Sequence, residues 1–502
     1  MNSRFSIRCQ IPFRAPGRNR KINMLSSMLE SNQTPMDRRQ MLRHSGAGIG
    51  TLALAQLLSE TNQAEASDGP SLAPRRPHFA PRAQRFVHLF ANGGPSQVDT
   101  FDPKPLLARL HGKPIPRDVI STVGDAQASG SPAFASKYRF RKRGQSGIDV
   151  SELLPEIGSM IDDICVVRSM HADDISHDGG IMFMNTGAAR LSRPSLGSWA
   201  TYGLGSENRN LPGFISMCPD GYPLNETQNW QSAFLPGIYQ GTFINSKHED
   251  VERLIENIRN RRVDSTQQRA QLDLLARLNR IHQKPRADEG RLESRIQSFE
   301  QAFRMQMEAT DAFDISQESK STLDMYGPGQ QARQLILTRR LLERGVRVVQ
   351  SWYGAGFPWD HHGEIEERLP KICGEVDRPI AAFLRDLKQR GLLDDTLVLW
   401  GGEFGRTPTS ELPHPTTTPG RDHNRHGFTV WLAGGGIKGG HVHGATDDAG
   451  FAAIQDKVHV HDLHATILHL LGLNHEELTY RYAGRDFRLT DVSGSVVHEI
   501  LA

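Results

Sequence analysis

Short apolar runs alternate with amphipathic segments along most of the chain. Runs rich in β-branched and aromatic residues occupy 85–90, 163–167, 211–217, 346–352, 396–400 and 427–433. Continuous apolar runs of this length are typical of strands that are buried on both faces of a sheet. Segments with helical spacing follow several of them, at 330–344, 369–389 and 461–472. This alternation predicts an α/β fold, a three-layer α/β/α sandwich with a mostly parallel central sheet.

The pattern changes between about 247 and 326. Arg, Glu and Gln become frequent there, and apolar residues recur at helical spacing. Three helices are predicted, marked by Val251, Leu254 and Ile258, by Leu274, Leu278 and Ile281, and by Leu292, Ile296, Phe299 and Phe303. We interpret this region as a helical insertion packed on an α/β domain that spans 85–502.

The N-terminal region has the features of an export signal. Arg38 and Arg39 form a twin-arginine pattern, an apolar stretch follows at 46–58, and Ala64-Glu65-Ala66 supplies small residues for cleavage. The alternative is a short amphipathic helix that opens the domain. We expect a signal region at 1–66 with cleavage near Ala66, and a Pro/Arg-rich linker at 67–84. The mature protein is then periplasmic or secreted, exported already folded by the twin-arginine machinery.

Composition narrows the set of partners. The formal net charge is +2, which gives no general argument for binding nucleic acid. The four cysteines are widely spread and form no metal-binding or disulfide pattern. No apolar run reaches the ~18 residues needed to span a bilayer, so no transmembrane anchor is expected.

Carboxylates and imidazoles gather after three predicted strands. In open α/β sheets, ligands bind outside the carboxyl ends of the strands. The candidate metal ligands at these positions are Asp360, His362, Glu403, Asp422, His423 and His426. Mixed nitrogen and oxygen donors without a nearby thiolate favour Zn²⁺ or Mn²⁺, with calcium as a third candidate.

Two further strand ends carry polar side chains. Asn92, Ser96 and Asp99 follow the first strand, where a capped turn explains them equally well. Ser176 and His177 follow the second, at the expected N-terminus of a helix, where backbone N–H groups favour an anion.

The candidate catalytic residues are Ser176, His177 and Arg406. The planar guanidinium of Arg406 can hold two oxygens of one anion. Ser176 is a candidate nucleophile, and His177 is its candidate base or a metal ligand.

Several motifs together resemble a known family. They are Gly93-Gly94-Pro95-Ser96, Ser176-His177, Trp359-Asp360-x-His362, Glu403-Phe404-Gly405-Arg406-Thr407-Pro408 and Gly420-Arg421-Asp422-His423. From about Arg85 to the C-terminus, the chain is similar to the secreted proteins called domain of unknown function 1501. These are placed in the alkaline phosphatase-like superfamily, with sulfatases and phosphoglycerate mutases. The resemblance implies that fold.

The chain differs from the superfamily pattern at the positions where relatives carry their nucleophile and metal ligands. His177, with Ser176 beside it, stands where relatives carry a Ser, Thr or modified Cys nucleophile. Asn92 stands where they carry Asp, and Glu403-Phe404 where they carry Asp-His. No Cys-x-Pro-x-Arg sequence occurs, which excludes the formylglycine chemistry of sulfatases.

The sequence therefore predicts an exported, metal-dependent hydrolase of an anionic ester. The substrate would be a phosphate or sulfate ester of a small molecule or polysaccharide, and a divalent ion would activate water near neutral pH. The alternative is a non-catalytic exported protein that uses the same fold to bind a polysaccharide or an anion.

Overall fold

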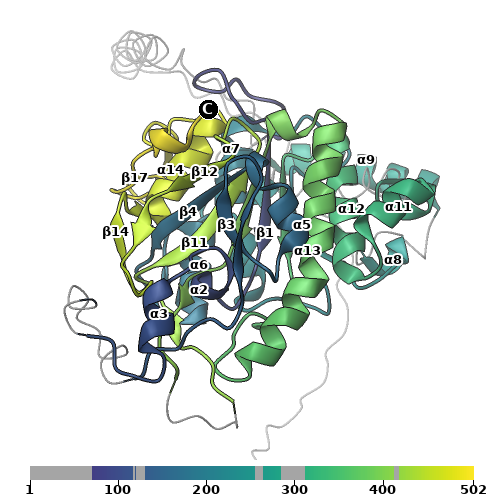
Figure 1. The fold of residues 1–502 in the computed structure, drawn as a ribbon. Coiled ribbons are helices and arrows are strands. Elements are labelled where there is room, and N and C mark those ends of the chain that lie inside the picture. The colour runs from purple at the N-terminus through teal and green to yellow at the C-terminus, as the bar shows by residue number, and fades with distance from the viewer. Residues whose placement is uncertain (1–70, 117–118, 120–130, 255–263, 284–310, 412–417) are drawn as a thin grey trace, which may run out of the picture. The chain divides into compact units, whose positions relative to one another are not determined.

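The computed structural model describes residues 71–502 apart from 117–118, 120–130, 255–263, 284–310 and 412–417 (Figure 1). They belong to a compact unit that spans 68–502. The predicted signal, with its cleavage site at Ala66, lies outside the described residues. In the described part of the predicted linker, the backbone N–H of Arg75 donates to Leu204 O and that of His78 to Gly472 O. Among the described residues, no helix is long and apolar enough to cross a membrane.

A nine-stranded sheet forms the centre of this unit. Its strand order is β12-β4-β11-β8-β1-β7-β5-β6, with β15 also paired to β4. β11 is antiparallel to β4 and β8, and the other pairings are parallel. The strands are β1 (Arg85–Phe90), β4 (Ile164–His171), β5 (Phe214–Cys218), β6 (Thr242–Asn245), β7 (Val348–Trp352), β8 (Thr396–Gly401), β11 (Phe428–Ala433), β12 (His441–His443) and β15 (Val458–His459).

Helices cover both faces of the sheet. Along β1, Val87 and Leu89 enter one hydrophobic core, whereas Phe86 and Phe90 enter another. The first core contains residues of α5 (Pro155–Ser159), α12 (Gln330–Glu343) and α13 (Ile365–Gln389). The second contains residues of α6 (His177–Thr186), α7 (Leu196–Leu204) and α14 (Val460–Leu470). The predicted α/β fold with a mostly parallel sheet between helical layers is confirmed.

The region predicted as a helical insertion contains α8 (Val251–Leu254), α9 (Ser265–Gln283) and α11 (Lys320–Tyr326). The predicted helix marked by Leu292 to Phe303 lies outside the described residues. Short elements elsewhere are α2 (Gln97–Thr100), α3 (Pro105–Leu110), β2 (Phe140–Arg143), β3 (Ile148–Ser151), β9 (Gly405–Arg406), β10 (His423–Asn424), β13 (Ala445–Thr446), β14 (Ala453–Gln455), β16 (Tyr480–Tyr482) and β17 (Arg485–Phe487).

The direction of β11 determines which loops meet. β1, β4, β7 and β8 run parallel and end at the same edge of the sheet. Because β11 runs the opposite way between β4 and β8, it starts at that edge, and Phe428 pairs with Met170 near the end of β4. The segment before β11 therefore reaches the same edge as the loops after β4, β7 and β8.

Two buried histidines make the second core sensitive to acid. His88 lies between the rings of Phe86 and Phe90 on β1, with no hydrogen-bond partner at Nε2. Burial, and then the nearby charge of His464, lower the pKa of His88 from 6.5 to about 3. Burial likewise lowers the pKa of His464 to about 3. Both rings are therefore neutral in the folded protein at neutral pH.

We predict that stability falls as the pH is lowered from about 6.5 toward 3, because the unfolded chain then binds protons that the folded chain excludes. Each histidine adds at most ~1.4 kcal/mol per pH unit to this slope. His88→Leu removes one such group, and it should flatten the dependence of the unfolding free energy on pH in denaturant titrations. An identical slope in the variant and the parent would contradict this explanation.

Candidate metal centre

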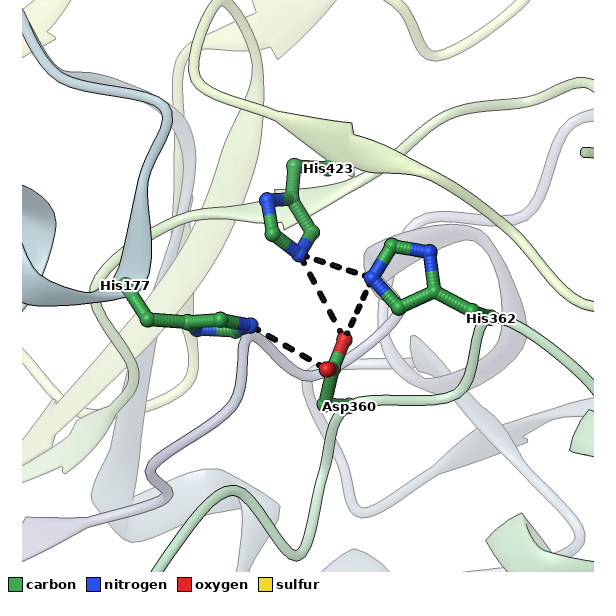
Figure 2. Close-up of side chains that lie close together, drawn as sticks. All are labelled: His177, Asp360, His362 and His423. Carbon is green, nitrogen blue, oxygen red and sulfur yellow. Dashed lines mark hydrogen bonds and ion pairs between the residues drawn. The ribbon is translucent and has the colours of Figure 1, made fainter. Parts of the chain in front are cut away.

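Four side chains converge at the carboxyl edge of the sheet (Figure 2). His177 begins α6, Asp360 and His362 lie on the loop after β7, and His423 begins β10. The Nε2 atom of His362 lies 3.0 Å from both Asp360 Oδ1 and His423 Nε2. His177 Nε2 lies 3.3 Å from Asp360 Oδ2. One potential ligand atom from each residue lies within 4.8 Å of the others.

Local structure brings these segments together. The two-stranded ribbon β9–β10 pairs His423 with Arg406. Gly93, which follows β1, packs directly on the loop that carries Asp360. A Cβ atom at Gly93 would lie only 2.6 Å from Asp360 N, and its φ of +115° is also one that glycine tolerates best. Only glycine allows these two backbones to approach so closely.

Each histidine in the group is oriented through its Nδ1 atom. His177 Nδ1 lies 2.7 Å from Glu403 Oε1, and His423 Nδ1 lies 2.8 Å from Ile175 O. His362 Nδ1 contacts the carboxylate of Glu411. Carboxylate and carbonyl oxygens accept hydrogen bonds, so Nδ1 carries the proton and Nε2 presents a lone pair. Ligating histidines are commonly held in this way.

The resulting lone pairs need a cation. The Nε2 atoms of His362 and His423 face each other at 3.0 Å, where two lone pairs repel unless a proton or metal ion lies between them. The buried Nε2 of His177 makes no hydrogen bond, since its contact with Asp360 lacks suitable geometry. A buried polar atom without a partner is costly. The three imidazoles and the Asp360 carboxylate therefore fit a divalent metal ion.

Asp360 is held in its anionic form. Burial raises the pKa of its carboxyl group, but the three neighbouring imidazole groups and the charge of Arg406 lower it far more. The net effect is a pKa well below the usual range. Asp360 therefore offers an anionic oxygen ligand at any physiological pH.

The histidines differ in their surroundings. Burial lowers the pKa of His177, but the carboxylates of Asp360 and Glu403 more than reverse this, so the pKa is raised. The contact with the Asp360 carboxylate is the main reason that the pKa of His362 is raised. Burial dominates at His423, and its pKa is lowered. Protons therefore compete for this group of nitrogens as the pH falls.

Glu403 lies behind His177 and is not one of the four grouped ligands. Its side chain is fully buried. Its Oε1 and Oε2 atoms lie 3.0 and 3.2 Å from the backbone N of Gly93, which donates to them. Together with the bond to His177 Nδ1, these contacts make Glu403 the residue that orients His177.

Arg406 is also buried, and each of its three guanidinium nitrogens donates to a protein oxygen. Nε donates to Gly94 O at 2.9 Å and Nη1 to Arg421 O at 3.0 Å. Nη2 donates to Gly93 O and to the Asp360 carboxylate. The guanidinium therefore orients Asp360. The sequence instead predicts that it holds two oxygens of a substrate anion.

Asp422 and His426 lie beside the centre. Asp422 forms a second potential ligand group with His362 and Glu411, and its Oδ1 accepts a hydrogen bond from His423 N at 2.7 Å. The ring of His426 instead stacks on Phe451, with 5.7 Å between centroids, and His426 belongs to neither group.

The polar residues after β1 connect loops. Asn92 Nδ2 donates to Gly354 O at 2.8 Å and to Gly356 O at 2.6 Å. Ser96 Oγ donates to Asp99 Oδ2 at 2.6 Å. Asp99 forms a buried ion pair with Arg421, with Nε 2.8 Å from Oδ2. Asn92 thus supports the loop after β7, and Asp99 the loop before β10.

Ser176 and the start of α6 are surrounded by acidic groups. The backbone N and Oγ of Ser176 both donate to Asp174 Oδ1, at 2.9 and 2.6 Å. Asp178 lies in the first turn of the helix. This helix end therefore meets carboxylates of the chain itself, where the sequence suggested a site for an anion.

Sequence reasoning missed two residues that complete the centre. Glu411 orients His362 through its carboxylate. Glu411 is held close to His362 because the Glu411 backbone N donates to Gly420 O at 3.1 Å. Phe357 stacks on His177 with 4.2 Å between ring centroids. Solvent still reaches the group, since the side chains of His362 and Asp360 are 36% and 20% exposed.

The chain is similar to several solved structures, but only at low sequence identity. No curated protein matches the chain in sequence. Similar solved structures include the PsFucS1 sulfatase from Pseudoalteromonas sp., 12% identical, covering 79% of this chain and 69% of that one, with a TM-score of 0.32. An alkaline phosphatase from the Antarctic bacterium TAB5 is 10% identical, covers 79% and 99%, and has a TM-score of 0.32. The lipoteichoic acid synthase LtaP from Listeria monocytogenes is 8% identical, covers 82% and 76%, and has a TM-score of 0.36.

A family model agrees with the motifs along the chain. It matches residues 83–501, which is nearly all of the α/β unit and includes every residue of the metal centre. The chain therefore belongs to the family described as "Protein of unknown function (DUF1501)".

Proposed function

We propose that the protein is an exported, metal-dependent hydrolase of phosphate or sulfate esters. The observation that carries the proposal is the convergence of three imidazole Nε2 atoms on the Asp360 carboxylate at a solvent-accessible sheet edge. An ion held by these four residues at an exposed edge would take water as a further ligand, and metal-bound water supports hydrolysis.

The donor set favours particular metals. His177, His362, His423 and Asp360 provide three nitrogens and a carboxylate. This combination suits Zn²⁺ or Mn²⁺, whereas Ca²⁺ takes six to eight oxygen ligands. We therefore propose zinc or manganese, and calcium becomes the least suitable of the three candidates.

When bound, such an ion would polarise an ester oxygen and lower the pKa of a water molecule. The chain's own residues would fix the geometry. Glu403 keeps the proton of His177 on Nδ1, and Arg406 holds the Asp360 carboxylate in place. The charge of Arg406 also offsets that of Asp360. The charge of a divalent ion would then be only partly balanced by buried groups, which favours an anionic substrate.

Water is the nucleophile that this arrangement supports best. The hydroxyl of Ser176 donates a hydrogen bond to Asp174, so we do not assign it as the attacking group. His177, at the position of the superfamily nucleophile, presents its Nε2 to the metal centre. We therefore assign His177 to metal binding and leave Ser176 outside the reaction.

The activity itself is tested by metal removal. We expect the metal-loaded protein to hydrolyse 4-nitrophenyl phosphate or 4-nitrophenyl sulfate, and a chelator to abolish turnover reversibly. Circular dichroism should show that the metal-free protein remains folded. A metal-loaded protein that turns over neither ester but binds anions or polysaccharides would favour the non-catalytic alternative.

Two variants separate the roles of neighbouring residues. Glu403→Gln should weaken metal affinity about 10- to 100-fold, because a carboxylate that orients a ligating histidine typically contributes this much. Ser176→Ala should leave both metal affinity and kcat close to those of the parent. Competition with a fluorescent chelator measures the first quantity. Loss of turnover in Ser176→Ala with full metal occupancy would restore Ser176 as the nucleophile.

We also propose export through the twin-arginine machinery, supported by Arg38-Arg39 and the apolar stretch that follows. Replacing both arginines by lysine preserves charge but removes the recognised pair. The variant should therefore accumulate inside the cell in a bacterial host, with its 1–66 region uncleaved. Unchanged export in cell fractionation would show that this pair is not the signal.

A further inference from the structure

A cavity lies at the same edge of the sheet as the metal centre. Its volume is about 660 Å³. Its lining includes Tyr353, Ala355 and Pro358 from the loop after β7, Pro219 and Asp220 from the segment after β5, and Gly374 of α13. A cavity of this size accommodates a small organic ligand.

One loop separates this cavity from the metal centre. Ala355 and Pro358 line the cavity, whereas Phe357 stacks on His177 and Asp360 belongs to the metal centre. Asn92 fixes the loop between them through the carbonyls of Gly354 and Gly356. Because β5 and β7 are parallel neighbours, their loops open at the same edge of the sheet. The cavity and the metal centre therefore lie on two sides of one loop.

The lining is more apolar than polar and has no excess of positive charge. The carboxylates of Asp220 and Glu375 line the cavity together with one guanidinium, that of Arg378, which donates to the backbone carbonyl of Met325 at 3.3 Å. The hydroxyl of Tyr353 donates to the Glu375 carboxylate. A phosphate or sulfate group would find no net positive charge here, so the cavity is suited to an uncharged ligand.

Hydrogen-bond acceptors and flat apolar surfaces share this lining. Carboxylates, the amide of Gln331 and backbone carbonyls supply acceptors. Pro379 has no N–H, so the carbonyl of Glu375, four residues earlier in α13, lacks its normal helical partner. Prolines and glycines supply the apolar part. A ligand with several hydroxyl groups around an apolar ring matches these features.

We propose that this cavity binds the neutral sugar portion of an ester whose anionic group reaches the metal centre. The inference rests on the proposed hydrolase function for its link to catalysis, but sugar binding itself requires no metal ion. The cavity would then select sugar esters over simpler esters of the same acid.

Gly374 allows a direct test. A Cβ atom there meets nothing within 4 Å, and the helical backbone accepts any side chain. Gly374→Phe should fill the cavity, whereas Gly374→Ala is the matched control, and both residues have a higher helix propensity than glycine. The probes are glucose, galactose, mannose and N-acetylglucosamine, with binding followed by saturation-transfer NMR and titration.

We expect at least one of these sugars to bind the parent and Gly374→Ala, with or without a chelator present, and to bind Gly374→Phe about tenfold more weakly, a loss of ~1.4 kcal/mol. No binding to the parent by any of the four sugars would overturn the inference, as would equal binding to Gly374→Phe.

Turnover separates this inference from the proposed function. In Gly374→Phe, KM for glucose 6-phosphate or glucose 6-sulfate should rise about tenfold relative to Gly374→Ala. The kcat/KM for the corresponding 4-nitrophenyl ester should stay the same. Sugar binding without turnover of any ester by the parent would support the cavity assignment and contradict the hydrolase. An equal loss for both kinds of ester would contradict the cavity assignment.

Discussion

The orientation of three imidazole rings is the constraint on which the rest of the site depends. Each ring donates a hydrogen bond from Nδ1 to a fixed oxygen, of Glu403, Glu411 or Ile175, and therefore directs an Nε2 lone pair to a common point. Nitrogens that face each other at 3.0 Å are stable only with positive charge between them. The surrounding hydrogen bonds thus define a cation site before any ion is considered.

The sheet supplies this arrangement through one reversed strand. If β11 were parallel to its neighbours, it would begin at the opposite edge of the sheet. The segment just before it, which carries His423, would then lie far from Asp360. The antiparallel β11 instead brings the β9–β10 ribbon to the ends of β4, β7 and β8. Gly93 then allows the backbone after β1 to contact that of Asp360, while its own N and O atoms hold Glu403 and Arg406. Distant parts of the chain therefore depend on one another for their positions.

Much of this organisation was predictable from the sequence. Apolar runs of five to seven residues located the core strands, and the rule that ligands bind beyond strand ends led to His177, Asp360, His362 and His423. The direction of β11 was not predictable from its composition, because a buried strand reads the same in either direction. The proximity of Glu411 was equally hidden, since it depends on a hydrogen bond to Gly420 within an irregular loop.

The roles of Glu403 and Arg406 could not be predicted from the sequence pattern alone. Both residues follow β8, as expected, but their side chains are completely buried and contact the candidate ligands His177 and Asp360. Sequence position fixes which edge of the sheet a residue reaches; hydrogen bonds with Gly93, His177 and Asp360 decide whether it acts as a ligand or orients one.

Anomalous diffraction at the zinc and manganese absorption edges would locate an ion bound by the three imidazoles and Asp360. We predict one strong peak about 2.0–2.2 Å from the Nε2 atoms of His177, His362 and His423 and from an Asp360 oxygen. A metal-supplemented, folded protein with no peak at this point, or with its ion bound elsewhere, would contradict it.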